Sequence, residues 1–435
     1  MVVTQRFVLD EIVDPYGARV EVTRAADGSV SDARFDLTGL PRVEPLLVGR
    51  PVAEVPRLVE RLCGVCPAAH HLAGVRALES LAGTPDLTPP ARAARRLLHH
   101  ASAVATHAVR AVTTDRDDAL ELRRFAKAVT TAVGSPGHFP VTAVPGGIAA
   151  PVPAGARDAC RELVASALAA ALRIADRASE GMAQRAGEGV PTRPFPGADV
   201  ALVDERGRPD LLGTRLRAVA ADGTVLLPGS PASSWDDLIA ESFPGTSSPR
   251  PYLVALGPER GAYRVGPVAQ LRIGELGTPR AADLQDLWRR SGGGAGAART
   301  VMTVYAVEVI GDLLDDPDLT SPAIRVDAGG EAGPADGVGV GWVDGPRGLL
   351  VHRYRVGEDR IVRDATILTP TAQNEPWLAW LLRGAVAEPG DGFVPREPRV
   401  ENAIREADPC LPVSSAPAGA MGVVVEERPT SSGGR

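Results

Sequence analysis

The sequence predicts an α+β protein, built mainly from a core bundle of long helices with β-hairpins and sheets at its periphery. Two patterns support this prediction. Apolar residues recur at intervals of three and four along alanine- and leucine-rich stretches, which is the spacing of one helix face. Elsewhere, short runs alternate apolar and polar residues between Gly- or Pro-rich breaks, which is typical of strands. A chain of 435 residues can form two or three packed subdomains.

The first segment, residues 1–50, is predicted to be β-rich. Residues 18–22 and 33–37 both alternate apolar and polar side chains. The dipeptide Asp27-Gly28 lies between them, and this pair favours a tight hairpin turn. We therefore expect an antiparallel hairpin near the N-terminus.

The second segment, residues 51–190, is predicted to be a helical core. The helical pattern extends from about residue 89 to 131 and again over 155–186. A Gly/Pro-rich loop at 133–154 separates these stretches. Residues 51–83 have helical character on both sides of a Cys-Gly-Val-Cys turn.

The C-terminal half is predicted to mix strands and helices. Residues 191–275 are rich in Pro, Gly and Asp and form a β-rich excursion. Residues 276–420 return to the helical and β core, and residues 421–435 are predicted to be a flexible tail. The expected elements of this core are helices near 280–290, 296–315 and 375–386, strands at 337–343, 348–356 and 360–368, and a helix just before Cys410.

Composition excludes several classes of partner. The net charge of −7 argues against a nucleic-acid-binding surface, which requires a basic face. Apolar stretches are interrupted by Arg, Gly or Pro before they reach membrane-spanning length. Four cysteines are too few for a disulfide scaffold, and no signal peptide is visible. These features predict a cytoplasmic protein that binds no nucleic acid and has no membrane span.

Two cysteine motifs, one near each end of the chain, indicate a metal site. Cys63 and Cys66 are separated by a Gly-Val turn that lets both sulfurs point inward to one ion. Cys410 follows an Asp-Pro pair near the C-terminus. Thiolates favour nickel, iron, zinc or copper over hard cations. A single Cys-x-x-Cys pair is a weak signal, but Cys410 and His70 could complete a three-cysteine, one-histidine site.

Several separated segments resemble the large subunits of nickel–iron hydrogenases, and they occur in that family's order. The resemblance extends from about residue 40 to 420 and is closest to the cytoplasmic, heteromultimeric type that passes electrons to NAD or a deazaflavin. Agreement at several collinear places is more specific than any one motif. The matching segments are residues 61–67, 144–147, 345–354, 371–374 and 401–410.

The resemblance implies a nickel–iron centre and a nearby magnesium ion. In the family pattern, Cys63 and Cys410 would be terminal nickel ligands, and Cys66 would bridge nickel to iron. Glu44 falls at the place of a carboxylate that helps to hold magnesium. Ile367 would lend a backbone carbonyl to the same ion.

The resemblance also implies residues for catalysis and a set of partners. Arg347 would act as an electrostatic or base partner in the heterolytic splitting of dihydrogen, with Asp408 and Pro346 shaping the pocket. His70 would tune the bridging thiolate. Family members depend on a small subunit with iron–sulfur clusters, and this chain has too few cysteines to hold such clusters itself. NAD- or deazaflavin-linked subunits would complete the complex.

The last motif departs from the family pattern Asp-Pro-Cys-x-x-Cys-x-x-His. Val413 stands at the second bridging cysteine, and valine cannot donate to a metal. Ala416 replaces a histidine that binds magnesium and marks the maturation cleavage site. Cys160 lies in a predicted helix far away in sequence, and nothing places it as a substitute.

Three hypotheses therefore remain open. The first is a hydrogenase large subunit, an oxidoreductase acting on dihydrogen. The second is a metal-poor, catalytically silent structural subunit of an oxidoreductase complex. The third is a mononuclear zinc- or nickel-binding protein that uses the three cysteines.

Other polar clusters have simpler interpretations. His99, His100 and His107 fall on one predicted helix, where histidines are more often core or surface residues than ligands. Arg95 and Arg96 are predicted to lie on a solvated helix face or a partner contact.

Overall fold

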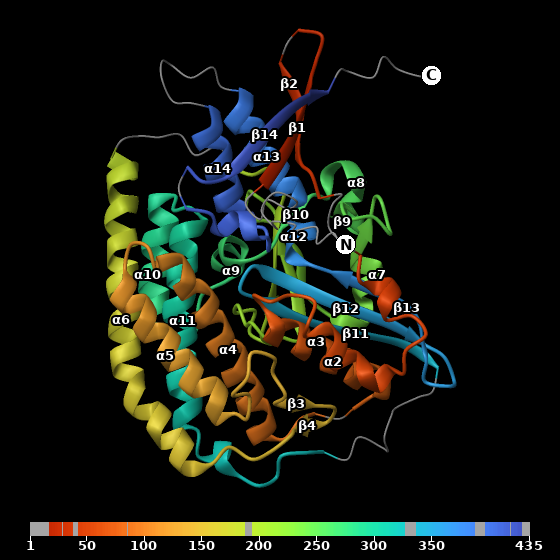
Figure 1. Ribbon diagram of the computed structural model, residues 1–435, viewed down its shortest axis with the longest axis vertical. Coiled ribbons are helices and arrows are strands. Elements are labelled where there is room, and N and C mark those ends of the chain that lie inside the picture. Colours follow the sequence, from red (N-terminus) through yellow and green to blue (C-terminus); the bar gives the residue numbers. More distant parts are fainter. Residues whose placement is uncertain are drawn as a thin grey trace, which may run out of the picture.

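The computed structural model describes residues 17–27, 29–37, 42–84, 86–187, 194–326, 336–387, 396–417 and 419–428. Long helices occupy one side of the molecule and sheets the other, which confirms the predicted α+β class with a helical bundle (Figure 1). No helix of the described residues combines the length and apolar character needed to cross a bilayer. Parts of the predicted segments 1–50 and 421–435 lie outside the described residues.

The bundle on the helical side is built around one buried helix, α11. The surface of this helix is apolar nearly all the way round, so neighbouring helices cover it on several sides. Proline begins α4 and α10, where its missing N–H costs nothing. The long helices are α4 (Pro89–Ala111), α5 (Arg116–Ala132), α6 (Ala154–Gly187), α10 (Pro279–Ser291) and α11 (Ala295–Asp315).

The predicted helical stretch from 89 to 131 is divided into two helices. Helix α4 ends at Ala111 and α5 begins at Arg116. The residues between them include a Val-Thr-Thr run, whose branched side chains favour helices less than alanine or leucine do. The break lets α5 turn back along α4, so both helices reach the bundle core.

A central antiparallel sheet lies beside the bundle, and its three strands correspond to the strands predicted at 337–343, 348–356 and 360–368. It contains β11 (Gly337–Gly345), β12 (Gly348–Val356) and β13 (Val362–Leu368) in that order. The hairpin between β11 and β12 turns through only two residues, Pro346 and Arg347.

Helix α3 (Pro67–Ala82) packs directly on β11. Glycines on the strand make this close approach possible. A Cβ atom at Gly341 would lie 2.1 Å from the carbonyl oxygen of Ala73, and one at Gly339 would lie 2.2 Å from that of Ala77. The helix backbone therefore rests almost on the strand backbone.

The predicted β-rich excursion forms a second sheet in the order β10-β5-β6-β7, plus a small β8–β9 pair. A second hydrophobic core joins it to the central sheet, with Trp235, Tyr263 and Trp342 among its buried side chains. The strands are β5 (Ala198–Val203), β6 (Arg215–Val219), β7 (Val225–Pro231), β8 (Ile239–Glu241), β9 (Pro251–Leu253) and β10 (Tyr263–Arg264).

Short elements connect these layers. The β-hairpin β3 (Ala143–Val144) and β4 (Gly147–Ile148) lies in the Gly/Pro-rich loop. The short helices are α2 (Val55–Val59), α7 (Trp235–Leu238), α8 (Gly257–Arg260), α9 (Pro267–Ile273) and α12 (Pro370–Gln373). Near the C-terminus are α13 (Glu375–Ala387) and α14 (Arg396–Ala407). The 3₁₀ turns include η1 (Glu44–Leu46), η2 (Val52–Glu54), η5 (Pro317–Thr320) and η6 (Pro412–Ser415).

The N-terminal hairpin is extended by a strand from the other end of the chain. Strands β1 (Gly17–Arg24) and β2 (Val30–Phe35) pair antiparallel as predicted. Strand β14 (Gly422–Arg428) pairs with β1 in parallel, at the top of Figure 1. The prediction of a flexible tail from residue 421 is therefore wrong for 422–428, because β1 offers these residues a free sheet edge.

Candidate metal centre

The two cysteine motifs meet in space. The Sγ atom of Cys63 lies 3.0 Å from that of Cys66 and 3.2 Å from that of Cys410. The third side of this sulfur triangle, between Cys66 and Cys410, is 4.0 Å. Each of these three cysteines is partly buried. Three soft donors from opposite ends of the chain thus share one small volume.

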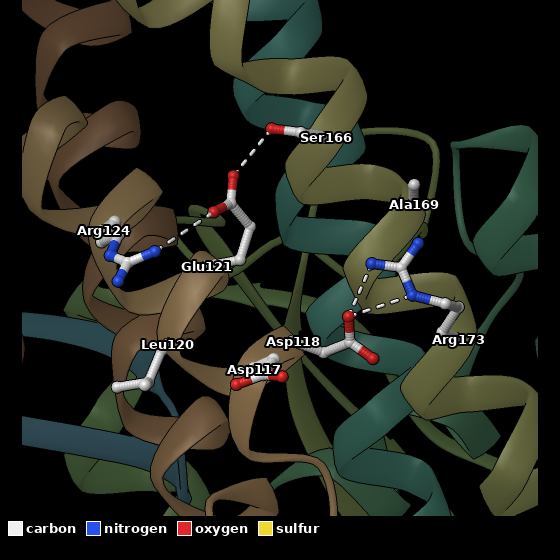
Figure 2. A pocket seen from close by; sticks show the side chains of 8 residues that line it. All are labelled: Asp117, Asp118, Leu120, Glu121, Arg124, Ser166, Ala169 and Arg173. Carbon is white, nitrogen blue, oxygen red and sulfur yellow. Dashed lines mark hydrogen bonds and ion pairs between the residues drawn. The ribbon is translucent and has the colours of Figure 1, made fainter.

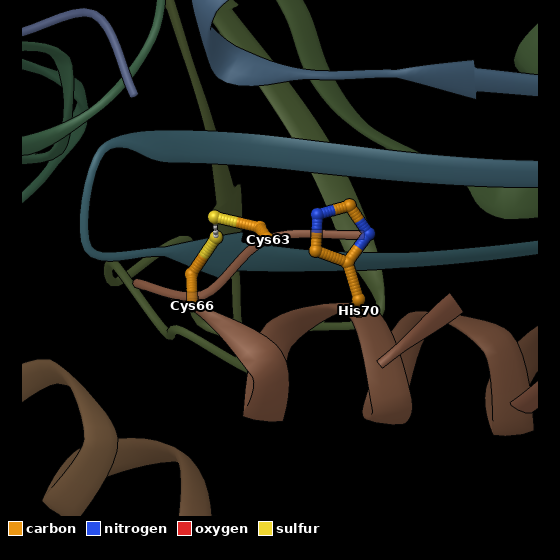
Figure 3. Close-up of side chains that lie close together, drawn as sticks. All are labelled: Cys63, Cys66 and His70. Carbon is orange, nitrogen blue, oxygen red and sulfur yellow. Dashed lines mark hydrogen bonds between the residues drawn. The ribbon is translucent and has the colours of Figure 1, made fainter. Parts of the chain in front are cut away.

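The first motif is positioned by the start of α3. Cys66 precedes the helix, and Pro67 occupies its first position. The backbone oxygen of Val65 accepts a hydrogen bond of 3.4 Å from Thr106 of α4, which ties the turn to the bundle. Figure 3 shows Cys63, Cys66 and His70 side by side at this end of α3. Their potential ligand atoms all lie within 4.8 Å of one another.

The second motif is positioned by the end of α14. Asp408 follows the helix with φ of 49°, a left-handed conformation that aspartate tolerates better than most residues. The Cys410 N–H donates a 2.8 Å hydrogen bond to the hydroxyl of Thr371. The Ser414 hydroxyl is 2.8 Å from the carbonyl oxygens of Pro409 and Leu411, and it closes the turn.

Three arginines converge on the carboxylate of Asp408. Arg347 lies 3.4 Å from Oδ2 through Nε, and Arg299 lies 3.7 Å from the same oxygen through Nη1. Arg110 of α4 bonds Oδ1 and also donates to Ser414. Sequence reasoning identified Arg347 and Asp408 but missed Arg110 and Arg299, because a single arginine on a helix gives no sign of its distant partner.

Arg347 is held charged in spite of its burial. Desolvation opposes the charge, but Asp408 and the three cysteines outweigh it and raise the pKa of the guanidinium. The side chain is 8% exposed. Its cation therefore faces the sulfur triangle from the β11–β12 turn.

The three thiols share negative charge unequally. Hydrogen bonds from Cys410 and Cys66 lower the pKa of Cys63. Contacts with Cys410 and Cys63, together with burial, raise the pKa of Cys66. The contact with Cys63 and burial raise the pKa of Cys410 to about 11, although the contact with Cys66 lowers it. Thiolates this close repel one another, so all three ionise together only when a cation lies between them. Metal binding at this triangle must therefore release protons.

A buried hydrogen-bonded chain extends from His70. Its Nδ1 lies 3.1 Å from Nε2 of His352, whose Nδ1 is hydrogen-bonded to the Tyr354 hydroxyl. Burial lowers the pKa of His70 to about 4 and that of His352 well below its usual value, so both rings are neutral near pH 7. The chain fixes the His70 ring beside the cysteines. His352 and Tyr354 had no assigned role in the sequence analysis, although both lie in the matching 345–354 segment.

The remaining predicted site residues take more varied positions. Pro346 lines a narrow cavity together with Arg347 and Asp408. Glu44 lies in η1, where its Oε2 accepts a 3.1 Å hydrogen bond from the Val43 N–H. Ile367 is buried in β13 opposite His352. Within the described residues, no cluster of three or more His, Cys, Asp or Glu side chains includes Glu44.

The donor set fits one soft ion but not the full nickel–iron pair. Cys63, Cys66 and Cys410 supply three thiolates of the kind that nickel accepts. Val413, at the second bridging position, is 2% exposed and belongs to the main hydrophobic core. Ala416 is also buried, and its carbonyl oxygen accepts a 3.1 Å hydrogen bond from Arg405. Neither replacement offers a side-chain donor.

Other candidate sites are explained by internal pairing. Figure 2 shows a polar hollow between α5 and α6, where Arg173 bonds Asp118 at 2.6 Å and Ser166 bonds Glu121 at 2.8 Å. His99 lies 2.9 Å from the carbonyl oxygen of Asp344 through Nε2. These contacts hold helices and strands together.

Comparisons with known proteins agree with this geometry. A family model described as nickel-dependent hydrogenase matches residues 42–112. One chain of the vhu F420-non-reducing hydrogenase of Methanocaldococcus jannaschii is 30% identical over 397 residues, covering 82% of this chain and 93% of that protein. The β subunit of the NAD-reducing hydrogenase HoxS of Cupriavidus necator is 27% identical over 478 residues, covering 97% of each chain.

A solved structure shows the same fold. The crystal structure of an NAD⁺-reducing [NiFe]-hydrogenase in the H₂-reduced state superposes with a TM-score of 0.81 at 27% identity. The match covers 90% of this chain and 95% of that one. The Ni-Fe-Se hydrogenase of D. vulgaris Hildenborough, at 20% identity and a TM-score of 0.63, shares the fold.

Proposed function

This chain belongs to the nickel-dependent hydrogenase large-subunit family, and we propose that it acts on dihydrogen within a multisubunit oxidoreductase complex. One observation carries the proposal. The sulfurs of Cys63, Cys66 and Cys410 lie 3.0–4.0 Å apart, although the motifs are separated by more than 340 residues. A fold that brings three thiols to one point serves metal binding better than it serves stability, because buried thiols repel one another when ionised.

Nickel held by these thiolates would supply a soft Lewis acid that polarises a bound molecule. The chain's own residues would supply positive charge and hold the side chains of the site in position. The Arg347 guanidinium provides fixed positive charge beside the sulfurs, and Asp408 holds that guanidinium in place. His70 is held beside the cysteine pair by His352. Because Val413 offers no donor, no step is assigned to iron.

Electrons would leave through a partner subunit with iron–sulfur clusters. The chain has four cysteines, and three of them form the sulfur triangle. The fourth, Cys160, is buried in α6 and cannot hold a cluster alone. Further subunits linked to NAD or a deazaflavin are the proposed final acceptors, and for NAD this agrees with the name of the HoxS relative. Magnesium at Glu44 and Ile367, and a cytoplasmic location, stay predictions from the sequence.

A second candidate is a structural subunit of the same complex without dihydrogen turnover. The burial of Val413 and Ala416 favours it, because the positions that would hold further metal are filled by packed apolar side chains. In that case the fold would serve as a scaffold for partner subunits.

Dihydrogen-dependent dye reduction distinguishes the two candidates. The chain would be purified in complex with its iron–sulfur partner and assayed with a viologen dye under hydrogen. We expect activity that disappears in Cys410→Ser and falls by about a hundredfold in Arg347→Lys, because lysine lacks the planar guanidinium. Arg353→Lys, on strand β12 directly after the turn that carries Arg347 and paired with Asp236, is the matched control and should retain activity. A stable complex without any activity would support the structural candidate.

A further inference from the structure

We infer that the sulfur triangle of this chain holds a single soft divalent ion, bound by Cys63, Cys66 and Cys410 with its fourth position open, and not a metal pair. The inference rests on the proposed function only in taking these three cysteines as ligands. It concerns how many ions this chain can hold, which family membership alone does not decide.

The triangle has the right size for one ion. Its sides are 3.0, 3.2 and 4.0 Å, so the circle through the three sulfurs has a radius of about 2.0 Å, shorter than the ~2.3 Å bond between zinc and a thiolate. One ion slightly above the sulfur plane can therefore bond all three atoms at once.

The place for a second ion is closed by packing. Val413 lies in η6 with its side chain in the main hydrophobic core, so it leaves neither a donor nor space for a bridging group. Ser414 is the next residue, but its hydroxyl already contacts the carbonyl oxygens of Pro409 and Leu411. Arg110 also donates to that hydroxyl, at 3.0 Å.

No nearby side chain replaces the missing bridge. The carboxylate of Asp408 is occupied by three arginines. Cys160 lies near the start of α6 and lines a different hollow, together with Lys127 and Ala156. A second thiolate bridge is therefore absent from the described residues around the triangle.

The local charge also favours one ion. Three thiolates and one divalent cation have a net charge of −1. Beside them, the three guanidiniums and the one carboxylate of the cluster have a net charge of +2; these groups belong to Arg110, Arg299, Arg347 and Asp408. A second divalent cation would add further positive charge to this arginine-rich, largely buried region. Uncompensated buried charge is costly, so the first ion is bound and the second is opposed.

The fourth coordination position stays open to a small molecule. His70 is the nearest further donor, but its ring is fixed by the hydrogen bond to His352. Its potential ligand atom lies within 4.8 Å of the Cys63 and Cys66 sulfurs, but the orientation of the ring is set by its contact with His352. Three protein ligands with one open position are typical of catalytic rather than structural metal sites.

Metal counting on the full chain tests the inference. The chain would be produced together with nickel–iron maturation proteins and purified without its iron–sulfur partner, so that cluster iron does not interfere. Nickel, zinc and iron would then be measured by mass spectrometry. We expect about one nickel or zinc ion per chain, essentially no iron, and no infrared bands from cyanide or carbon monoxide.

Matched variants separate site binding from adventitious binding. Cys63→Ser and Cys410→Ser should each lower the bound metal by at least about tenfold, whereas Cys160→Ser should retain one ion per chain. Circular dichroism would confirm that each variant is folded. Nickel and iron in equal amounts would overturn the inference and leave the proposed function intact. A metal-free wild-type chain, or equal loss in Cys160→Ser, would also overturn it. One ion without dihydrogen activity in the partner complex would instead refute only the proposed function.

Discussion

The two cysteine motifs meet at one point but retain different features. The N-terminal motif has three clustered side chains with a donor atom: Cys63, Cys66 and, on the first turns of α3, His70. The C-terminal motif keeps Cys410, but Val413 and Ala416 are apolar and buried. Its backbone is nevertheless held in a defined turn by side-chain hydrogen bonds and ion pairs.

This difference shows that the geometry of the C-terminal turn does not depend on metal ligands. The turn is held by the ion pairs of Asp408, by the hydroxyl of Thr371 and by the internal hydrogen bonds of Ser414. Side chains that bind metal can therefore be replaced while those that shape the backbone persist. The N-terminal motif, by contrast, is held by the packing of a whole helix on a sheet.

The largest effect is expected from removing the charge of Asp408. Asn also tolerates the left-handed backbone at this position, so Asp408→Asn changes the charge without adding strain. Three guanidiniums would lose their carboxylate, and we expect a loss of about 3–5 kcal/mol in the free energy of unfolding. Urea denaturation of the metal-free chain measures it. The control is Asp315→Asn in the exposed pair with Arg161, where the change should stay below about 1 kcal/mol. Equal unfolding midpoints for the two variants would contradict the role given to the arginine cluster.

The N-terminal motif should depend more on helix–sheet packing. Gly341→Ala would place a methyl group 2.1 Å from the Ala73 carbonyl oxygen and push α3 away from β11. We expect a loss of about 3 kcal/mol and weaker metal binding, because α3 carries the Cys66 end of the triangle. Gly296→Ala in α11 is the control, since its new Cβ meets nothing within 4 Å and should be neutral or stabilising by up to ~1 kcal/mol. Native-like stability of the Gly341 variant would show that α3 is not fixed by this contact.

Local sequence patterns were sufficient for elements whose partners lie nearby in the chain. The β11–β13 strands and the helices α6, α11 and α13 are confirmed, because alternation or helical periodicity reports directly on which face is buried. Strand β14 was missed because its partner β1 lies some 400 residues earlier. A short run of valines shows that a segment is apolar but not which edge it covers.

The same limit applies to the site. The meeting of the two motifs was predicted from the family resemblance, not from any local pattern. Arg95 was predicted on a solvated face or partner contact, and this prediction is wrong. It is 3% exposed, bonds Glu79 at 2.9 and 2.6 Å, and donates to the carbonyl oxygen of Gly147. A charged residue on an amphipathic helix looks solvated until its distant partners are known.

The β11–β12 hairpin, which carries Arg347, contains the buried carboxyl group of Asp344. We expect the stability of the chain to depend on pH through this group. Burial raises the pKa of this carboxyl group to about 7, above its usual 3.8. The folded chain therefore binds the proton more tightly than the unfolded chain, and this group's contribution to stability falls as pH rises from about 4 to about 7.

Asp344→Asn removes this contribution. Relative to the native chain, the variant should gain about 2 kcal/mol in unfolding free energy between pH 5 and pH 8. Urea unfolding at the two pH values measures the change. The exposed Asp364→Asn on β13 is the control and should show the same difference at both. A constant difference for Asp344→Asn would mean that this carboxyl group is ionised throughout.

The smallest effect on stability is expected from a substitution at Val413. This residue is where the C-terminal motif lacks a donor atom. Cysteine is a small hydrophobic residue of similar size, so Val413→Cys should cost less than about 1.5 kcal/mol. Val413→Ala is the matched control, because it leaves a larger void and adds no donor. If only the donor was lost from this turn, zinc titration of Val413→Cys should show a second, weaker equivalent that is absent from both the native chain and Val413→Ala. If the cysteine variant still binds only one ion, then the packing around η6 and the charge of the arginines also exclude a second ion. In that case one restored sulfur does not make the C-terminal motif equivalent to the N-terminal motif.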